Sequence, residues 1–85
     1  MNQHEFEAII NFRKQECNRN GFNALHISVE ELAELCGSTT KDYSVIAEAM
    51  KQCMLEGDSF ENSDEKELSV VYYCDNLSPS RRKLF

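Results

Sequence analysis

The sequence predicts a small α+β domain that consists of three helices followed by a β-hairpin near the C-terminus. Apolar residues recur at helical spacing in three segments before Gly57, and a run of β-branched and aromatic residues follows at positions 68–73. The chain has 85 residues, which is enough for one small domain. We expect residues 1–75 to form this domain and residues 76–85, with their proline and basic cluster, to form a flexible, mobile tail.

The first helix is expected at residues 5–18, where Phe6 and Ile10 lie near one apolar face. Gly21 follows a polar segment and is suited to a positive φ, which marks the end of the helix. Residues 24–27 then form a brief strand or an extended lead-in to the next helix.

The second helix is expected at residues 29–36. Ser28 is a suitable N-cap, and Glu31 three residues later completes a capping box. Gly37 can take the positive φ that commonly follows a helix C-terminus. The apolar face of this helix is made by four residues at helical spacing: Val29, Leu32, Ala33 and Cys36.

The third helix is expected to begin between Thr40 and Ser44 and to run to about residue 56, where Gly57 ends it. Its apolar residues also follow helical spacing: Ile46, Ala49, Met50 and Cys53. Beyond it, residues 59–61 and 68–73 are expected to form the two strands of the hairpin. The residues that we expect in the core are Leu32, Ile46, Met50 and Val71.

The order of these segments resembles that of a winged helix-turn-helix domain, over roughly residues 5–75. One set of residues matches the family's Leu-Ala-x-x-apolar-Gly segment: Leu32, Ala33, Cys36 and Gly37. A second set matches the third helix and its Glu-Gly end: Ile46, Ala49, Met50, Cys53, Glu56 and Gly57. The resemblance implies that residues 60–73 form the wing and that the third helix is the one that reads DNA.

Three features depart from the family's pattern. The link at residues 38–44 is longer than the usual turn, which changes how the third helix is presented. Asp58 stands where a leucine or isoleucine normally enters the first strand of the wing. The wing tip at residues 62–67 is acidic, which argues against its contact with phosphates.

The resemblance predicts a small non-enzymatic transcriptional regulator that binds double-stranded DNA. Lysines, hydroxyl groups and helix N-termini favour phosphate oxygens. The expected nucleic-acid-binding residues lie along the third helix and in the tail: Thr40, Lys41, Ser44, Lys51, Gln52, Arg81, Arg82 and Lys83. The third helix carries no arginine, although arginine to guanine is the commonest specific contact, so a merely solvated polar face is the competing interpretation.

The charge distribution favours a different function. The net charge is −6, and residues 30–67 carry eleven acidic side chains against three lysines, a local net of −8. This sign opposes DNA binding, which depends on neutralising phosphates. The alternative is an acidic protein-interaction adaptor or inhibitor on a winged-helix scaffold, for instance a phage or mobile-element product that mimics DNA towards a basic protein.

The carboxylates of this alternative surface follow the third helix and continue through the hairpin: Glu56, Asp58, Glu61, Asp64, Glu65 and Glu67. They lack the residue order of a calcium-binding loop. The simplest interpretation of them is a solvated acidic hairpin that discourages pairing between sheet edges.

We expect no catalytic site, no metal site and no cofactor. The cysteines lack the close pairs typical of zinc sites: Cys17, Cys36, Cys53 and Cys74. Cys36 and Cys53 are expected to be small apolar residues of the core. His26 has no accompanying pattern of a nucleophilic site, and strand alternation predicts that it points away from the apolar face of its segment.

The sequence contains neither a recognisable signal peptide nor an apolar run that could span a bilayer, so we expect a cytoplasmic protein that does not bind membranes. The first helix also carries more apolar residues than one core-facing stripe needs, which suggests a contact between two copies of the chain. These residues are Phe6, Ala8, Ile9, Ile10 and Phe12.

Overall fold

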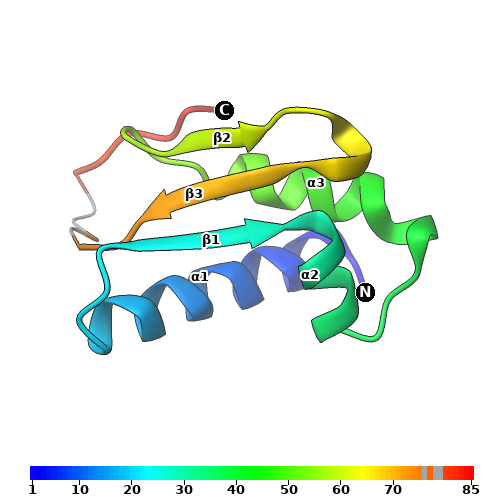
Figure 1. Ribbon diagram of the computed structural model, residues 1–85, viewed down its shortest axis with the longest axis horizontal. Coiled ribbons are helices and arrows are strands. Elements are labelled where there is room, and N and C mark those ends of the chain that lie inside the picture. The colour runs from blue at the N-terminus through cyan, green and yellow to red at the C-terminus, as the bar shows by residue number, and fades with distance from the viewer. Residues whose placement is uncertain (76, 78–79) are drawn as a thin grey trace.

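The computed structural model describes residues 1–75, 77 and 80–85. Within these residues the chain forms a small α+β domain with three α-helices, as the sequence predicts, and one three-stranded antiparallel sheet (Figure 1). The elements follow in the order α1 (Gln3–Arg19), β1 (Ala24–Ser28), α2 (Val29–Leu35), the 3₁₀ turn η1 (Thr40–Asp42), α3 (Tyr43–Gln52), β2 (Ser59–Asn62), the 3₁₀ turn η2 (Glu65–Glu67) and β3 (Ser69–Tyr73).

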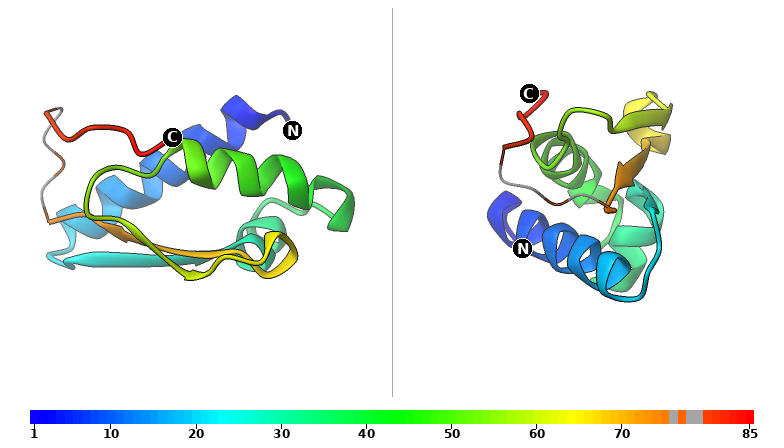
Figure 2. Two further views of the ribbon diagram at one scale, coloured as in Figure 1. Left: turned by 90° about the horizontal axis from the view of Figure 1, so that it is seen from above. Right: turned by 90° about the vertical axis from the view of Figure 1, so that its left-hand side faces the viewer.

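The sheet has the strand order β1-β3-β2, and the central strand β3 pairs antiparallel with both neighbours. The expected hairpin is therefore present as β2 and β3, and the short segment before α2 adds a third strand. Helices α1 and α3 lie against the same face of the sheet, and no described element covers its opposite face (Figure 2). The molecule thus has two layers, with the core between them.

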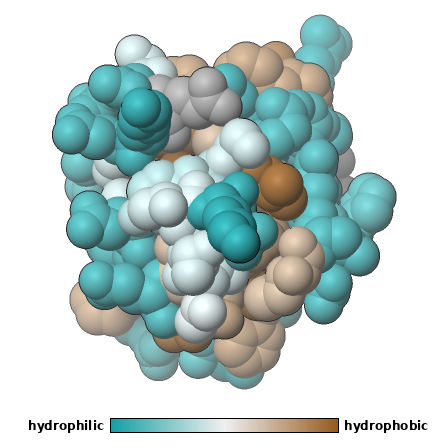
Figure 3. Space-filling view, turned by 90° about the vertical axis from the view of Figure 1, so that its right-hand side faces the viewer, coloured by the Kyte–Doolittle hydropathy of each residue, from teal (hydrophilic) through white to brown (hydrophobic). Residues whose placement is uncertain are grey.

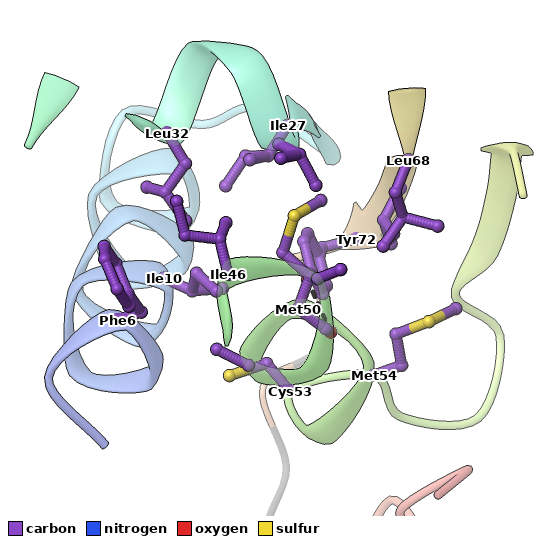
Figure 4. Close-up of a cluster of buried hydrophobic side chains, with 14 of the residues drawn as sticks. Phe6, Ile10, Ile27, Leu32, Ile46, Met50, Cys53, Met54, Leu68 and Tyr72 are labelled. Atoms are coloured by element: carbon purple, nitrogen blue, oxygen red, sulfur yellow. Dashed lines mark hydrogen bonds between the residues drawn. The ribbon is translucent and has the colours of Figure 1, made fainter. Parts of the chain in front are cut away.

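The core fills the space between the helices and the inward face of the sheet (Figure 4). Its fully buried side chains come from all three helices, from the turn after α3, and from β3 and its approach; the large ones include Phe6, Ile10, Leu32, Ile46, Met50, Met54, Leu68, Val70 and Tyr72. The Tyr72 hydroxyl group donates a hydrogen bond to the backbone carbonyl of Met50 at 2.7 Å, which satisfies this group inside the core.

The expectation that Val71 belongs to the core is wrong. Val70 and Tyr72 point towards the helices, and Val71 lies on the outward face and is only half-buried. Successive side chains of a strand point to opposite faces, so the register of β3 with its neighbours places only every second residue in the core.

The N-cap at Ser28 forms as the sequence predicts, but the expected capping box is only half made, because the Glu31 side chain does not accept the backbone N–H of Ser28. The Ser28 hydroxyl oxygen accepts a hydrogen bond from the backbone N–H of Glu31 at 3.1 Å. After the helix, Gly37 takes a φ of 66°, which a side chain would disfavour. Because these contacts are local, the sequence predicts the helix closely: the expected range is 29–36 and the observed one is Val29–Leu35.

Helix α3 ends at Gln52, earlier than the residue 56 expected from the sequence. Asp58 causes this difference, because its carboxylate accepts hydrogen bonds from the backbone N–H groups of Leu55 and Tyr73, both at 2.8 Å. The first bond closes a tight turn over residues 55–58 that replaces the last helical turn. Gly57 lies inside this turn with a φ of 97°, so it serves the turn and does not end the helix.

Part of the expected mobile tail packs against the domain. Backbone hydrogen bonds join the N–H of Glu56 to the carbonyl of Arg82 at 2.9 Å and the N–H of Leu84 to the carbonyl of Met54 at 3.1 Å. The ring of Phe85 meets the ring of Phe60 edge-on, with centroids 6.1 Å apart. Residues 76, 78 and 79 of the expected tail lie outside the described residues.

No helix in the described part of the chain is both long and apolar enough to cross a bilayer.

Candidate nucleic-acid interface

The start of α3 and the loop of the hairpin meet at one end of the molecule and enclose a hollow of about 460 Å³. The hollow is lined by Thr40, Tyr43, Ser44 and Lys66. On this end of the molecule, residues of intermediate hydropathy gather at the centre, and hydrophilic side chains lie on both sides of them (Figure 3). Among the residues whose side chains the structure describes, the lining therefore offers three hydroxyl groups and one ammonium group, and no carboxylate.

Two local structures position these groups. The long link after α2 contains the turn η1, in which the backbone N–H of Asp42 donates to the carbonyl of Thr39 at 3.0 Å, and this turn leads directly into α3. On the hairpin side, the Asp64 carboxylate accepts the backbone N–H of Lys66 at 3.1 Å and so caps the turn η2. The buried side chain of Leu68 follows η2 and anchors it to the core.

The charges around the hollow are mixed. Lys41 and Lys66 are exposed cations, one on each side. Asp42 occupies the N-cap position of α3 without making a capping hydrogen bond, and Asp64 and Glu67 flank Lys66 on the hairpin loop. Two lysines therefore stand among exposed carboxylates, which limits the attraction of this surface for phosphate.

The expected contacts at the other end of α3 form a separate group. The ammonium of Lys83 donates to the Gln52 side-chain oxygen at 3.0 Å, and the Gln52 amide donates to the Glu48 carboxylate at 3.1 Å. Lys51 is half-buried in the last turn of the helix, and Arg82 is exposed. Ser44 and Gln52 are eight positions apart in α3, so about 12 Å of helix separates Gln52 from the hollow.

Arg81 has a different environment from the one expected of a DNA contact. Its guanidinium forms an ion pair with the Asp58 carboxylate at 2.9 Å and donates to the backbone carbonyls of Glu56 and Tyr73 at 3.0 and 2.8 Å. The sequence groups Arg81 with its two basic neighbours, but the fold turns its side chain inward. The prediction that it contacts DNA therefore lacks structural support.

The alternative acidic surface is also only partly assembled. Asp58 is buried by its ion pair, and the Glu56 carboxylate accepts the backbone N–H of Arg82 at 3.1 Å. The Glu61 carboxylate is hydrogen-bonded to the His26 imidazole, and His26 lies on the outward face of the sheet as strand alternation predicts. Exposed carboxylates remain at Asp64 and Glu67, and the side chain of Glu65 lies outside the described part.

No group of histidine, cysteine, aspartate or glutamate side chains in the described residues is arranged to hold a metal ion. Burial raises the pKa of the Cys53 thiol to about 11 and also raises the pKa of the Cys36 thiol. A raised pKa is the opposite of what activates a nucleophilic cysteine. Cys53 is a core residue as expected, whereas Cys36 is only half-buried against the core.

The chain matches no family model, and comparisons with curated proteins and with solved structures also give no match.

The sequence did not identify Lys66 as part of this surface. Lys66 lies between Glu65 and Glu67 in the sequence, so the sequence indicates an acidic turn in this segment. Only the return of the hairpin towards α3 brings it beside Thr40 and Ser44. Ser44 and Lys66 are more than 20 positions apart in the sequence, so their proximity depends on how these two segments pack together. A local sequence pattern cannot predict such a contact.

Proposed function

We propose that the chain is a small non-enzymatic DNA-binding protein of the winged helix-turn-helix type, which acts as a transcriptional regulator. The element order and the strand order β1-β3-β2 support this proposal, because they are compatible with a wing formed by the β2–β3 hairpin. In this arrangement α3 is the recognition helix, and its exposed N-terminal end faces the duplex.

The observation that carries the proposal is the meeting of α3 and the hairpin loop at one hollow. Thr40 and Ser44 on one side and Lys66 on the other share this surface, and Lys41 lies next to it in the chain. Hydroxyl groups and lysines contact phosphate oxygens, and such contacts fix the position of a protein on the duplex. The N-terminal end of a helix adds a favourable electrostatic field.

The contacts offered by this surface are of the backbone-positioning kind. The described part of α3 contains Lys51 and Gln52 near its end and no arginine, and the Gln52 amide is occupied by Glu48 and Lys83. We therefore propose that affinity comes from a few phosphate contacts and that discrimination between base sequences is weak.

The proposal is tested by fluorescence anisotropy with labelled duplexes of random and genomic sequence at about 50 mM salt, where weak phosphate contacts are strongest. Lys41→Glu and Lys66→Glu should each abolish or strongly weaken binding. Arg19→Glu is the matched control. Arg19 is exposed in the last turn of α1, away from the hollow, and its substitution changes the net charge by the same amount as each lysine variant. Absence of binding by the wild type, or equal loss in all three variants, would overturn the proposal.

The charge of residues 30–67 supports a second candidate function, that of an acidic adaptor or inhibitor of a basic protein. In the described residues the exposed carboxylates of its surface are Glu56, Glu61, Asp64 and Glu67, of which Glu56 accepts the backbone N–H of Arg82 and Glu61 is paired with His26. If the wild type binds no duplex, this candidate takes precedence, and Asp64→Lys with Glu67→Lys should then remove binding to a basic partner such as a polylysine-coated surface.

A further inference from the structure

A second hollow, of about 550 Å³, lies between α1, the turn after it and α2. Three large apolar side chains on its rim remain exposed: Phe12 at 55 %, Phe22 at 64 % and Leu35 at 56 %. Ile9 lies between them and is half-buried. We call this surface the α1–α2 hollow.

Exposed apolar residues that are scattered singly need no explanation, but these residues are gathered around one concavity. They come from three different segments, so the fold itself brings them together. The core does not need them, because Phe6 and Ile10 already fill the inward face of α1. Of the apolar excess expected of this helix, Phe6 and Ile10 lie in the core, whereas Ile9 and Phe12 line the α1–α2 hollow.

Two charged residues line the same hollow and have opposite signs. Arg13 and Glu16 lie one turn apart on α1 and are both half-buried. Neither side chain makes a hydrogen bond or an ion pair with another described residue. A surface that carries one positive and one negative group at this spacing is complementary to itself when two helices lie antiparallel across a two-fold axis, because Arg13 of each copy then meets Glu16 of the other.

The distribution of charge along the chain favours this surface over the acidic surfaces as the place where a second copy binds. Two molecules with a net charge of −6 repel each other, and residues 30–67 alone carry −8. Residues 1–29, which supply most of the hollow, carry three basic and three acidic side chains and are neutral. The described lining of the α1–α2 hollow carries one basic and one acidic group, Arg13 and Glu16, so the lining itself meets its own copy without net like-charge repulsion.

We propose that the chain forms a homodimer about a two-fold axis through the α1–α2 hollow, with α1 antiparallel to α1 of the partner. Phe12, Phe22 and Leu35 supply the apolar centre of the contact. Arg13 and Glu16 supply two reciprocal ion pairs at its border. This proposal does not depend on DNA binding, since the hollow that holds Lys66 is a different surface.

The test is the molar mass in solution, measured by light scattering after size exclusion and by sedimentation equilibrium up to about 1 mM protein, a range that detects even weak dimers. The wild type should show twice the chain mass of 9.8 kDa. Leu35→Glu should reduce the mass to that of one chain. Leu84→Glu is the matched control, because Leu84 is similarly exposed at 45 % but lies in the C-terminal segment, and it should leave the dimer intact.

A charge exchange tests the two-fold arrangement directly. In a dimer of Arg13→Glu, the new glutamate at position 13 of each copy faces Glu16 of the other, so two acidic groups repel each other at both sites. In a dimer of Glu16→Arg, two basic groups repel each other at the same sites. Each variant alone should therefore be monomeric. An equimolar mixture of the two variants should restore a species of twice the chain mass, because each acidic pair now faces a basic pair. Circular dichroism checks that both variants remain folded.

A wild type that is monomeric up to the highest concentration would overturn the proposal, and the hollow would then be available to a different partner. A dimer that persists in Leu35→Glu would also overturn it, because the contact would lie elsewhere. Failure of the mixture to restore the dimer would overturn the antiparallel two-fold geometry.

Discussion

The guanidinium of Arg81 and the carboxylate of Asp58 form an ion pair at 2.9 Å, in which the side chains are 11 % and 0 % exposed. Asp58 also accepts two backbone N–H groups, from the turn after α3 and from the end of β3. One carboxylate therefore joins three segments: the turn before β2, the last residue of β3 and the C-terminal segment. Asp58 stands where the winged-helix pattern has a leucine or isoleucine. In this chain the residue at that position holds the C-terminal segment against the domain through its ion pair with Arg81.

Removing one partner of this ion pair should destabilise the domain. Arg81→Ala leaves the buried Asp58 with only its backbone donors, and we expect a loss of about 3 kcal/mol in the free energy of unfolding. Urea denaturation monitored by circular dichroism measures this loss. The neighbouring exposed residue provides the control, because Arg82→Ala should change stability by less than about 0.5 kcal/mol. Equal effects of the two variants would show that the ion pair does not hold the C-terminal segment.

Two adjacent valines of β3 test the orientation of the strand. Val70→Ala removes two methyl groups from the core and should cost about 2 kcal/mol. Val71→Ala removes the same groups from the outward face and should cost less than about 1 kcal/mol, most of it from the lower strand propensity of alanine. The comparison is matched in chemistry and position, so a larger effect at Val71 than at Val70 would contradict the register of β3.

The sequence predicted the elements whose causes are local. The cap at Ser28 and the apolar spacing along the three helices depend on residues within one or two turns, and the structure confirms them. The positions 70–73 are apolar without interruption, so the sequence contained no alternation that could distinguish the inward Val70 from the outward Val71. Pairing with β1 and β2 decides this choice, and such pairing is not encoded in the segment itself.

The features that the sequence missed depend on contacts between distant residues. The packing of the C-terminal segment follows from the contact between Asp58 and Arg81, which are 23 positions apart. The early end of α3 is an exception, because Asp58 and Leu55 close the turn that replaces the last helical turn and are only three positions apart. A cluster of three basic residues next to a proline is typical of a mobile tail when it is read alone. The candidate site shows the same limit, since Thr40, Lys41 and Ser44 were identified on one helix end but Lys66 was not.

The pH dependence of stability should report the burial of Cys53. The pKa of this thiol is raised from 9.0 to about 11 in the folded state, mainly by desolvation. Between these values the folded protein binds more protons than the unfolded chain, so this contribution to stability is complete below pH 9 and is lost as the pH rises through about 11. The loss should be on the order of 2 kcal/mol.

Cys53→Ala isolates this contribution. The variant lacks the thiol, so the difference in unfolding free energy between wild type and variant should shrink between pH 8.5 and about 11 under reducing conditions. The buried Lys14, whose pKa is lowered mainly by desolvation, has the opposite pH dependence but is present in both proteins. A difference that stays constant over this range would show that the Cys53 thiol is not held in the protonated state by the fold.

If the chain binds DNA as proposed, the salt dependence of this binding should be shallow, because few cations can reach phosphate at once. Lys66 lines the hollow at the start of α3, and Lys41 is next to its lining residue Thr40 in the chain. Lys51 and Arg82 lie towards the C-terminal end of α3. Neutralising two to four phosphates predicts a log–log slope of magnitude about 2–4 for the affinity against salt concentration. Lys41→Gln and Lys66→Gln should each reduce this magnitude by about 0.9, whereas Arg19→Gln should leave it unchanged.

Point substitutions are preferable to deletion of residues 80–85, because deletion also removes the ion pair that stabilises the fold. Binding whose slope is unaffected by both lysine substitutions would show that the duplex does not contact this end of the molecule.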